Sequence, residues 1–432
     1  MNIEKYIANK TTEIGKKSFT RWIVKIAVIT IALSLSVMIL SDALMRGFQH
    51  EISQKIFGFW GHIHVMDASV HRTFEVKPIT HDSVLYNKIR GINSISYKLE
   101  GSPKSFFNTN KGKITSKGGI QHIQKYAHIP GIISTKKYME GIFIKGVGAD
   151  YRWEYLKSYL EEGDILDIYD ENESREILIS RYSARRLNLK TGEAVIIYFV
   201  LNDKKVPLKF IISGIYNTGL EEYDKKFAIV NIEVIQKLMG WSKDQIGGYE
   251  IFVDDIDDMK LLSQYLYIEE LPVDMYAETI IQQFPNIFEW LKLQSVNEWV
   301  ILILMLAICI INMITTILIL ILGRTHMIGL LKSMGMLDLS IQKIFMHYAF
   351  RILVKGLFWG NLIGIGLAFL QKQFGFIRLN EADYYLSEAP MEINIWIILL
   401  LNVGVLLVTL ITLIIPSFLI GRIDPIKALR FD

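Results

Sequence analysis

Long apolar runs predict four segments that can cross a lipid bilayer. A transmembrane helix needs about 20 apolar residues, and residues 299–322 and 393–420 reach that length without a charged side chain. Residues 22–44 and 345–370 hold two charges each, near the ends of the runs, where long side chains can reach the interface. Residues 345–370 have one alternative, a buried helix of a soluble domain. The predicted transmembrane helices are residues 22–47, 297–322, 345–371 and 393–420.

The charges that flank these runs predict their orientation. Lys and Arg outnumber Asp and Glu in the N-terminal segment 1–21, in the loop 323–344 and in the tail 421–432. The loop 372–392 instead carries four carboxylates against two basic side chains. Because positive loops stay in the cytoplasm, both termini are predicted to be cytoplasmic. Residues 48–296 would then form a large domain on the opposite side.

Apolar stripes at helical spacing lie outside both of the first two spans. The stripes are Phe48, Ile52, Ile56 and Phe59, and Phe284, Ile287, Phe288 and Leu291. Pro285 suits the first turn of the second helix. Two helices that rise from adjacent spans would form a stalk and act as a rigid lever. Alternatively, the stripes only pack locally against the outer domain.

Between these stripes the pattern predicts mixed α and β structure. The predicted strands are residues 62–66, 142–147, 176–179, 194–201, 208–215, 227–231 and 249–253, and the predicted helices are 151–160, 180–189, 232–239 and 257–267. Two of the strands form a hairpin joined by the polar loop Asn202, Asp203, Lys204, Lys205, Val206 and Pro207. The predicted fold is therefore a membrane protein with four transmembrane α-helices and a large mixed α+β domain inserted between helices 1 and 2.

Composition and motifs argue against an enzyme. The net charge of +3 is too small to indicate nucleic-acid binding, and the single cysteine, Cys309, permits no disulfide framework. The chain lacks a G-x-x-x-x-G-K-[ST] loop, a G-x-S-x-G elbow, an H-E-x-x-H motif and an EF-hand loop. His62 and His64 could hold a metal but more simply line a polar strand face, and the carboxylates of residues 254–258 suit a turn or helix cap. We expect a chain with no catalytic residues, no metal site and no ability to hydrolyse ATP alone.

The loop 323–344 contains a short amphipathic helix. Its apolar stripe is Met327, Leu330, Leu331 and Met334. Gly335 can end this helix, and Asp338 can cap the next one. An apolar stripe on the cytoplasmic face requires either a partner groove or the membrane surface. In the tail, Asp424 and Pro425 can begin a second short helix.

At these residues the chain resembles the FtsX/MacB-like ABC transporter permeases. The segment 329–335 after Gly323-Arg324 is similar to the coupling segment of that family, and residues 424–432 are similar to its C-terminus. Further features resemble the lipoprotein-releasing, LolC/LolE-type branch. These are Gly47-Phe48, Leu187-Asn188-Leu189 with Gly192, residues 214–219 followed by Asp224, and Tyr384-Tyr385-Leu386 with Pro390. The likeness lies in the order of the features along the chain.

The resemblance implies a permease subunit in the bacterial inner (cytoplasmic) membrane, with its large domain in the periplasm. Its partners would be an ABC ATPase dimer, which holds ATP and Mg, and a second permease chain, either the same or homologous. The complex would extract lipoproteins from the outer leaflet and pass them to a periplasmic lipoprotein chaperone. No nucleic acid and no cofactor of the chain's own are implied.

Three candidate sites follow from this resemblance. The ATPase-coupling residues are Met327, Ile328, Gly329, Leu330, Leu331, Lys332, Ser333, Met334 and Gly335. The lipoprotein-binding residues, on the outward halves of the first two spans, are Val37, Leu40, Leu44, Phe48, Trp299, Val300 and Ile303. The chaperone-docking loop is residues 202–207, which is short for a recruiting hairpin.

The resemblance leaves two other functions open. One is an FtsX-like mechanotransmitter that regulates a periplasmic hydrolase, and the other is a MacB-like efflux permease. The outer domain, roughly 240 residues by the spans above, is larger than expected for the first of these. The sequence does not decide between a homodimer and a heterodimer of permeases.

Overall fold

The computed structural model describes residues 18–70, 77–98, 114–135, 138–168, 175–201 and 203–417. The chain forms two compact units. The helical unit comprises residues 1–50, 289–378 and 388–432, and the sheet unit comprises residues 51–288 and 379–387. The N-terminal segment up to residue 17 and the predicted tail helix at Asp424 lie outside the described residues.

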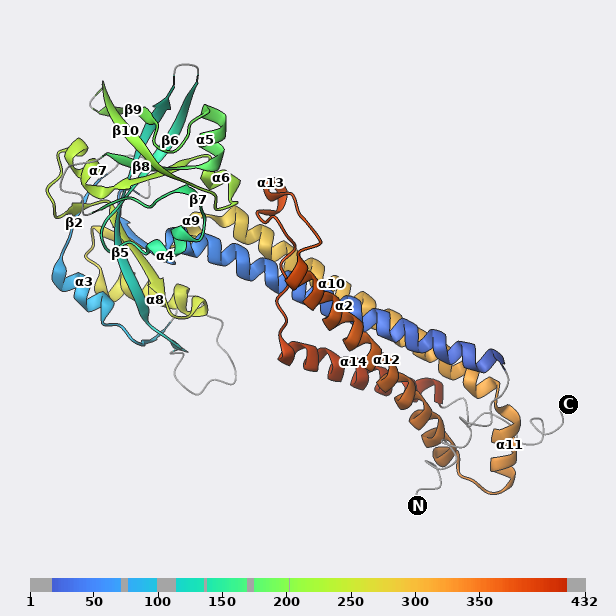
Figure 1. The fold of residues 1–432 in the computed structure, drawn as a ribbon. Helices are drawn as coiled ribbons and strands as arrows, with labels where there is room; N and C mark the ends of the chain where they lie inside the picture. Colours follow the sequence, from blue (N-terminus) through green and yellow to red (C-terminus); the bar gives the residue numbers. More distant parts are fainter. Residues whose placement is uncertain are drawn as a thin grey trace. The chain divides into compact units, whose positions relative to one another are not determined.

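Four helices of the described chain are long and apolar enough to cross a membrane, as predicted (Figure 1). They are α2 (Ser18–Trp60), α10 (Pro285–Leu322), α12 (Asp338–Phe374) and α14 (Ile395–Ser417). Many of their large apolar side chains, such as Ile311, Leu362 and Leu400, are exposed in the chain by itself. Exposed apolar side chains along a helix are stable in hydrocarbon, so the surface of these helices suits a lipid environment.

The first and third spans pack closely because α12 presents a row of glycines to α2. Gly356, Gly360 and Gly364 recur every four residues on one face of α12. A Cβ atom added at Gly360 would lie 2.9 Å from Leu35 Cβ and 3.0 Å from Ala32 O. The close approach also lets Ser36 Oγ donate to the carbonyl of Gly360 at 2.9 Å. Small residues that bring backbones together are a common means of packing helices in a membrane.

The third and fourth spans are joined by a polar contact. Asn361 on α12 and Asn402 on α14 exchange side-chain hydrogen bonds of 2.7 and 2.9 Å. Each amide satisfies the other, which lowers the cost of placing polar groups between apolar helices. The contact fixes which faces of α12 and α14 meet.

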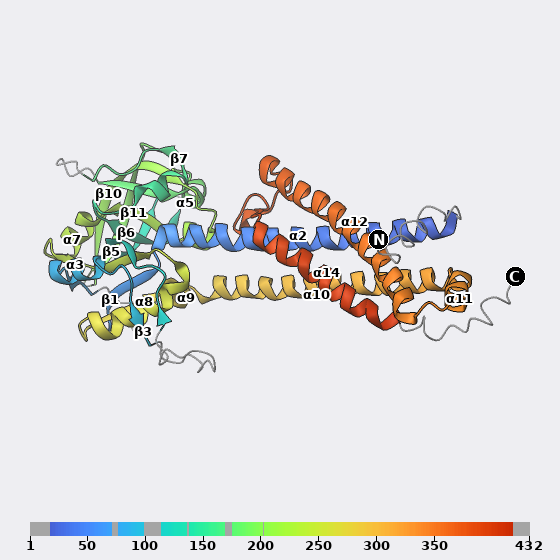
Figure 2. The same ribbon diagram turned by 90° about the horizontal axis from the view of Figure 1, so that it is seen from below.

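Helices α2 and α10 are longer than a bilayer is thick. With 43 residues, α2 would be about 64 Å long at 1.5 Å per residue, against about 30 Å of hydrocarbon. The two helices lie side by side in both views (Figures 1 and 2), with Gln49 Nε2 donating to Ser295 Oγ at 2.7 Å and the rings of Phe57 and Phe288 stacked at 5.9 Å. The helical extensions predicted outside both spans are present, and α10 begins at Pro285 as expected.

The sheet unit is built on a ten-stranded mixed sheet with the order β14-β1-β13-β5-β6-β11-β8-β10-β7, in which β9 pairs with both β10 and β5. Its strands are β1 Ile63–Asp67, β5 Ile120–Ser134, β6 Met139–Val147, β7 Leu160–Gly163, β8 Glu176–Ser180, β9 Ala194–Leu201, β10 Lys204–Tyr216, β11 Phe227–Asn231, β13 Gly248–Val253 and β14 Met275–Thr279. Small pairs are formed by β2 Ile79–Thr80 with β12 Gln245–Ile246, and by β3 Ser96–Tyr97 with β4 Ile114–Thr115.

The double pairing of β9 closes part of this sheet into a ring. The pairings run from β5 through β6, β11, β8, β10 and β9 and back to β5. Apolar side chains from these strands fill the ring and are almost fully buried. They include Ile133, Ile144, Ile177, Val195, Ile197, Phe210, Ile212, Ala228 and Val230. A closed ring removes exposed strand edges and makes this part of the unit stiff.

Short helices connect and flank the strands. They are α3 Ser83–Arg90, α4 Trp153–Lys157, α5 Arg181–Leu187, α6 Glu221–Asp224, α7 Ile232–Met239, η1 Ile256–Asp258, α8 Met259–Tyr265, η2 Leu266–Glu270, α9 Ile280–Gln283 and α13 Glu381–Tyr384. Ser180 caps α5 by accepting from Ser183 N, as its sequence predicted. The helix predicted over residues 151–160 is shorter than expected, because α4 ends at Lys157 and Leu160 already pairs with β10 in strand β7.

We predict that Gly360→Val destabilises the helical unit by about 1–3 kcal/mol, because a branched side chain overpacks the contact between α12 and α2. The matched control is Gly366→Val on the same helix, where an added Cβ meets nothing within 4 Å. Thermal stability of the purified full chain in detergent measures both variants. Equal loss of stability in the two would show that α12 does not depend on this close approach.

Candidate functional site

The predicted coupling segment forms the helix α11 (Thr325–Ser333), which Gly335 follows in the left-handed conformation (φ 83°). The end of the helix at this glycine is as predicted. Its predicted apolar stripe divides into two faces, since Met327 and Leu331 pack against the transmembrane core, whereas Leu330 (45%) and Met334 (76%) are exposed. Ile328, which lies off that stripe, is the fully buried anchor.

Exposed apolar side chains continue past the end of α11. Leu330, Met334, Leu337 and Leu339 form what we call the coupling patch. Asp338 does not cap α12 as predicted, because the N-cap position is Leu337. Asp338 lies instead in the first turn of α12 and pairs with Lys332 at 2.9 Å, which ties α11 to α12. An apolar patch held on a fixed helix–turn–helix is a candidate surface for a partner protein.

A small pocket lies behind α11 in the helical unit. It is lined by Leu320, Arg324, Met327, Ile344, Phe345 and Tyr348. Its walls come from α10, α11 and α12, so a displacement of α11 would change its shape.

The predicted lipoprotein-binding residues of the helical unit differ in their exposure. Leu40 and Leu44 on α2 are half-buried and pack with Ala43, Ala368 and Met391. The residues on α10, namely Trp299, Val300 and Ile303, are at least half exposed. Of the remaining two, Val37 is half-buried and Phe48 forms an edge-to-face ring contact with Trp290 at 6.4 Å. The structure therefore does not gather the predicted residues into one cluster.

The predicted chaperone-docking loop is mostly strand. β10 begins at Lys204, which pairs with Leu201, so Lys204 to Pro207 continue the hairpin instead of forming a polar loop. Asn202 lies outside the described residues, and Asp203 has a φ of 59°, which suits a tight turn. The pattern of basic residues and proline suggested a loop, but cross-strand pairing keeps these residues in the ladder. The hairpin tip exposes Val200 together with Lys204, Lys205 and Pro207.

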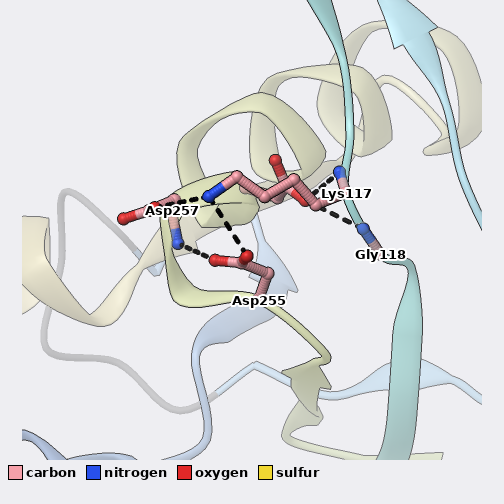
Figure 3. A network of polar contacts seen from close by, with 5 residues as sticks. Lys117, Gly118, Asp255 and Asp257 are labelled. Carbon is pink, nitrogen blue, oxygen red and sulfur yellow. Dashed lines mark hydrogen bonds and ion pairs between the residues drawn. The ribbon is translucent and has the colours of Figure 1, made fainter. Parts of the chain in front are cut away.

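The two histidines and the acidic run considered for metal binding have structural partners. His62 and His64 are both buried, and burial lowers the pKa of each to about 4. In the acidic run, Asp255 accepts from Asp257 N, and Lys117 pairs with both carboxylates at 3.3 and 2.8 Å (Figure 3). Within the described residues, no group of three or more His, Cys, Asp or Glu side chains is arranged to hold a metal ion.

Two of the features that carried the family resemblance meet in the sheet unit. Asp224 accepts hydrogen bonds from Thr218 Oγ1 at 2.7 Å and from the backbone N–H groups of Thr218 and Gly219 at 3.2 Å. Lys55 on α2 donates to the carbonyl of Tyr385 at 3.1 Å. Gly219 has a φ of 73°, and a Cβ there would lie 2.8 Å from Lys55 Nζ and 3.2 Å from Tyr385 O. Only glycine therefore fits between the turn, α2 and the loop that joins the third and fourth spans.

Comparisons with known proteins agree with the family resemblance inferred from the sequence. Residues 299–425 match the family model described as FtsX-like permease C-terminal. The chain is 20% identical to the lipoprotein-releasing system transmembrane protein LolC of Xylella fastidiosa, over 96% of both chains. It is 18% identical to the protein of the same system named LolE in Haemophilus influenzae, over 96% of this chain and 95% of that one.

Among solved structures, the extracellular domain of the noncanonic ABC-type transporter YknZ from Gram-positive bacteria matches with a TM-score of 0.31 and 12% identity, over 50% of this chain and 98% of that one. The resemblance inferred from the sequence is confirmed by the other comparisons. One part of the chain, residues 299–425, matches the FtsX-like permease model, and the chain is similar over nearly its whole length to LolC and LolE proteins.

We predict that the stability of the sheet unit depends on pH through Asp224. Burial raises the pKa of this carboxyl to about 6, from 3.8. Because the folded state then binds the proton more tightly than the unfolded state, the contribution of Asp224 is greatest below pH 4 and is lost as the pH rises through 6, by about 3 kcal/mol. Native-state hydrogen exchange of β8 and β10 at several pH values, compared between the native chain and Asp224→Asn, measures the difference. Parallel pH profiles would contradict it.

Proposed function

We propose that the chain is the permease subunit of an ABC transporter that extracts lipoproteins from the outer leaflet of the bacterial inner membrane and passes them to a periplasmic chaperone. The observation that carries this proposal is the likeness over 96% of the chain to proteins named as components of the lipoprotein-releasing system. The four apolar helices and the mixed sheet unit suit such a subunit. Hydrolysis of ATP, with its Mg, then belongs to a separate ATPase dimer.

The coupling patch is the proposed contact with the ATPase. Its exposed leucines and methionine can enter a groove of a cytoplasmic partner, and methionine adapts well to such a groove. The buried Ile328 and the ion pair between Lys332 and Asp338 hold α11 to α12, so movement of the ATPase would be passed to the spans. This placement requires the loop 323–344 to be cytoplasmic, as its excess of Lys and Arg predicts.

Helices α2 and α10 are the proposed lever. Each runs without a break through its apolar span and beyond it. An α-helix resists bending because its hydrogen bonds run along its axis, and sharp kinks arise mainly at identifiable interruptions such as proline or inserted residues. Movement of the spans would therefore appear at the outer ends of the same helices, in the periplasmic sheet unit.

Extraction requires an alternative apolar surface for the acyl chains. Each methylene moved into water costs about 0.8 kcal/mol, so the anchor of a multiply acylated protein costs on the order of tens of kcal/mol without such a surface. The exposed side chains of Trp299, Val300 and Ile303 offer one wall, and Leu40 and Leu44 lie on the other helix of the pair. We place the lipoprotein between these helices, with a second permease chain closing the site.

The tip of the β9–β10 hairpin is the proposed contact with the chaperone. Among the described residues, the two strands beyond Tyr198 pair only with each other, since the pairing of β9 with β5 is confined to residues 196–198. This short arm presents the exposed Val200 beside Lys204 and Lys205, which suits a partner with an apolar rim and acidic side chains.

We predict that Leu330→Glu combined with Met334→Glu prevents copurification of the ATPase, because two carboxylates would have to be desolvated in its groove. The control is His326→Glu, which adds a charge at another exposed position of α11. Copurification of the ATPase with the coupling-patch variant at the level of the native chain would exclude this surface as the docking site.

We predict that Trp299→Glu blocks lipoprotein release and leaves the complex assembled, because a buried charge opposes acyl-chain binding. Leu40→Glu or Leu44→Glu should act in the same way. The matched control is Trp396→Glu, since Trp396 at the start of α14 is 76% exposed and Trp299 is 65% exposed.

The measurement is the distribution of lipoproteins between the two membranes after the native chain is depleted and each variant is supplied. Accumulation in the inner membrane with Trp299→Glu, Leu40→Glu or Leu44→Glu, but not with the control Trp396→Glu, supports the proposed function. If lipoproteins are distributed normally between the two membranes after depletion of the native chain, the proposed function is refuted. If depletion instead leaves a periplasmic hydrolase inactive, the result favours the mechanotransmitter.

A further inference from the structure

A fully buried ion pair lies where α2 ends against the sheet. Lys145 on β6 and Glu250 on β13 are both 0% exposed, and their Nζ and Oε1 atoms are 2.7 Å apart. β5 runs between these two strands, so the pair bridges across it. Gln124 on β5 supports the carboxylate by donating from Nε2 to Glu250 Oε2 at 2.6 Å.

The same ammonium group holds the end of α2. Lys145 Nζ donates to the carbonyl oxygen of Phe59 at 2.6 Å, one residue before the end of the helix at Trp60. Carbonyls in the last turn have no partner within the helix, and this end carries partial negative charge. The ammonium also lies 4.8 Å from the ring centroids of Phe59 and of Trp60. Lys145 therefore contacts the backbone and both terminal side chains of α2.

The link between α2 and the sheet is otherwise very short. Gly61 and His62 alone separate the helix from β1, and Gly61 has a φ of 73°. A glycine in this conformation allows a sharp change of direction and adds no side chain that would fix the angle. The contacts made by Lys145, and that of His64 Nε2 to the carbonyl of Trp60 at 2.5 Å, are among those that set the direction in which α2 meets the sheet.

Stability alone does not explain a buried ion pair at this place. Burial lowers the pKa of Lys145 and raises that of Glu250, because desolvation disfavours both charges. The attraction between the two charges acts in the opposite direction on each pKa. Well-packed apolar residues at such positions are often equally stable or more stable. An ion pair differs from apolar packing in its dependence on geometry. The ammonium must reach both a carbonyl and a carboxylate at fixed positions, whereas apolar contacts tolerate small shifts of one element along another.

We infer that Lys145 and Glu250 are positioning residues of the transport cycle, forming a rigid joint that transfers movement of α2 into the sheet unit. The inference rests on the proposed function for its readout of transport. Without the pair, α2 would pivot about Gly61 and its movement would be lost before it reached the sheet.

The test is the double variant Lys145→Met with Glu250→Met, which replaces both charges by unbranched apolar side chains. The full complex is assayed for ATP hydrolysis and for lipoprotein release. We expect hydrolysis to persist and release per ATP hydrolysed to fall about tenfold, within the usual range of coupling between sites. The control is Lys117→Met with Asp257→Asn, which removes an exposed pair of the same unit (Figure 3) and should change neither rate.

Release at the native level in the double variant would overturn the inference and leave the proposed function intact. Absence of release by the native chain would instead refute the proposed function. If the double variant does not fold, the native chain still provides a test, with spin labels at the exposed positions Glu51 on α2 and Glu233 on α7. If the joint is rigid, the distance between these labels is the same with and without ATP. A change of several ångströms, about the rise of three helical residues, would refute the inference.

Discussion

The unbroken backbone hydrogen bonding of α2 and α10 is the constraint on which the rest of the structure depends. Inside hydrocarbon a helix must satisfy its own peptide groups, and the same hydrogen bonds make it stiff. Both helices continue well past the length that a bilayer requires. Each therefore belongs to the helical unit along one part and to the sheet unit along the other. Continuous helices of this kind can transmit mechanical work when force is supplied by a partner.

Much of this fold could be predicted because its signals are local. Long apolar runs with few charges located the four spans, and a serine cap with a following amphipathic turn located α5. The central strand β5 was missed because Pro130 and Gly131 interrupt its pattern. The structure explains why proline is tolerated there. Phe143, which lies opposite Pro130 on β6, donates its N–H away from β5, to the carbonyl of Lys226. The proline nitrogen therefore faces the other side of β5, between the end of the pairing with β13 at Tyr126 and the start of the pairing with β9 at Ile132, where no donor is required.

The candidate sites were less predictable because they depend on which elements meet. Helical spacing located α11 but gave no reason to expect that Ile328 would be buried and that the stripe would divide. The glycine row on α12 and the burial of Lys145 with Glu250 arise from contacts between residues distant in sequence. A lone lysine within an apolar strand gave no local signal of its partner. The turn at Asp224 was recognised from the sequence only as a motif. The structure was needed to show that Asp224 holds the backbone of Gly219 close to Lys55.

The most direct test of mechanical transmission is to make the lever flexible. A Gly-Ser insertion after His50 in α2 and a second before Glu289 in α10 would interrupt both helices at the boundary between the two units. Lipoprotein release and ATP hydrolysis are then measured on the same purified complex in membranes. The account predicts that hydrolysis continues while release is lost. Release at the native rate per ATP with both helices interrupted would contradict it.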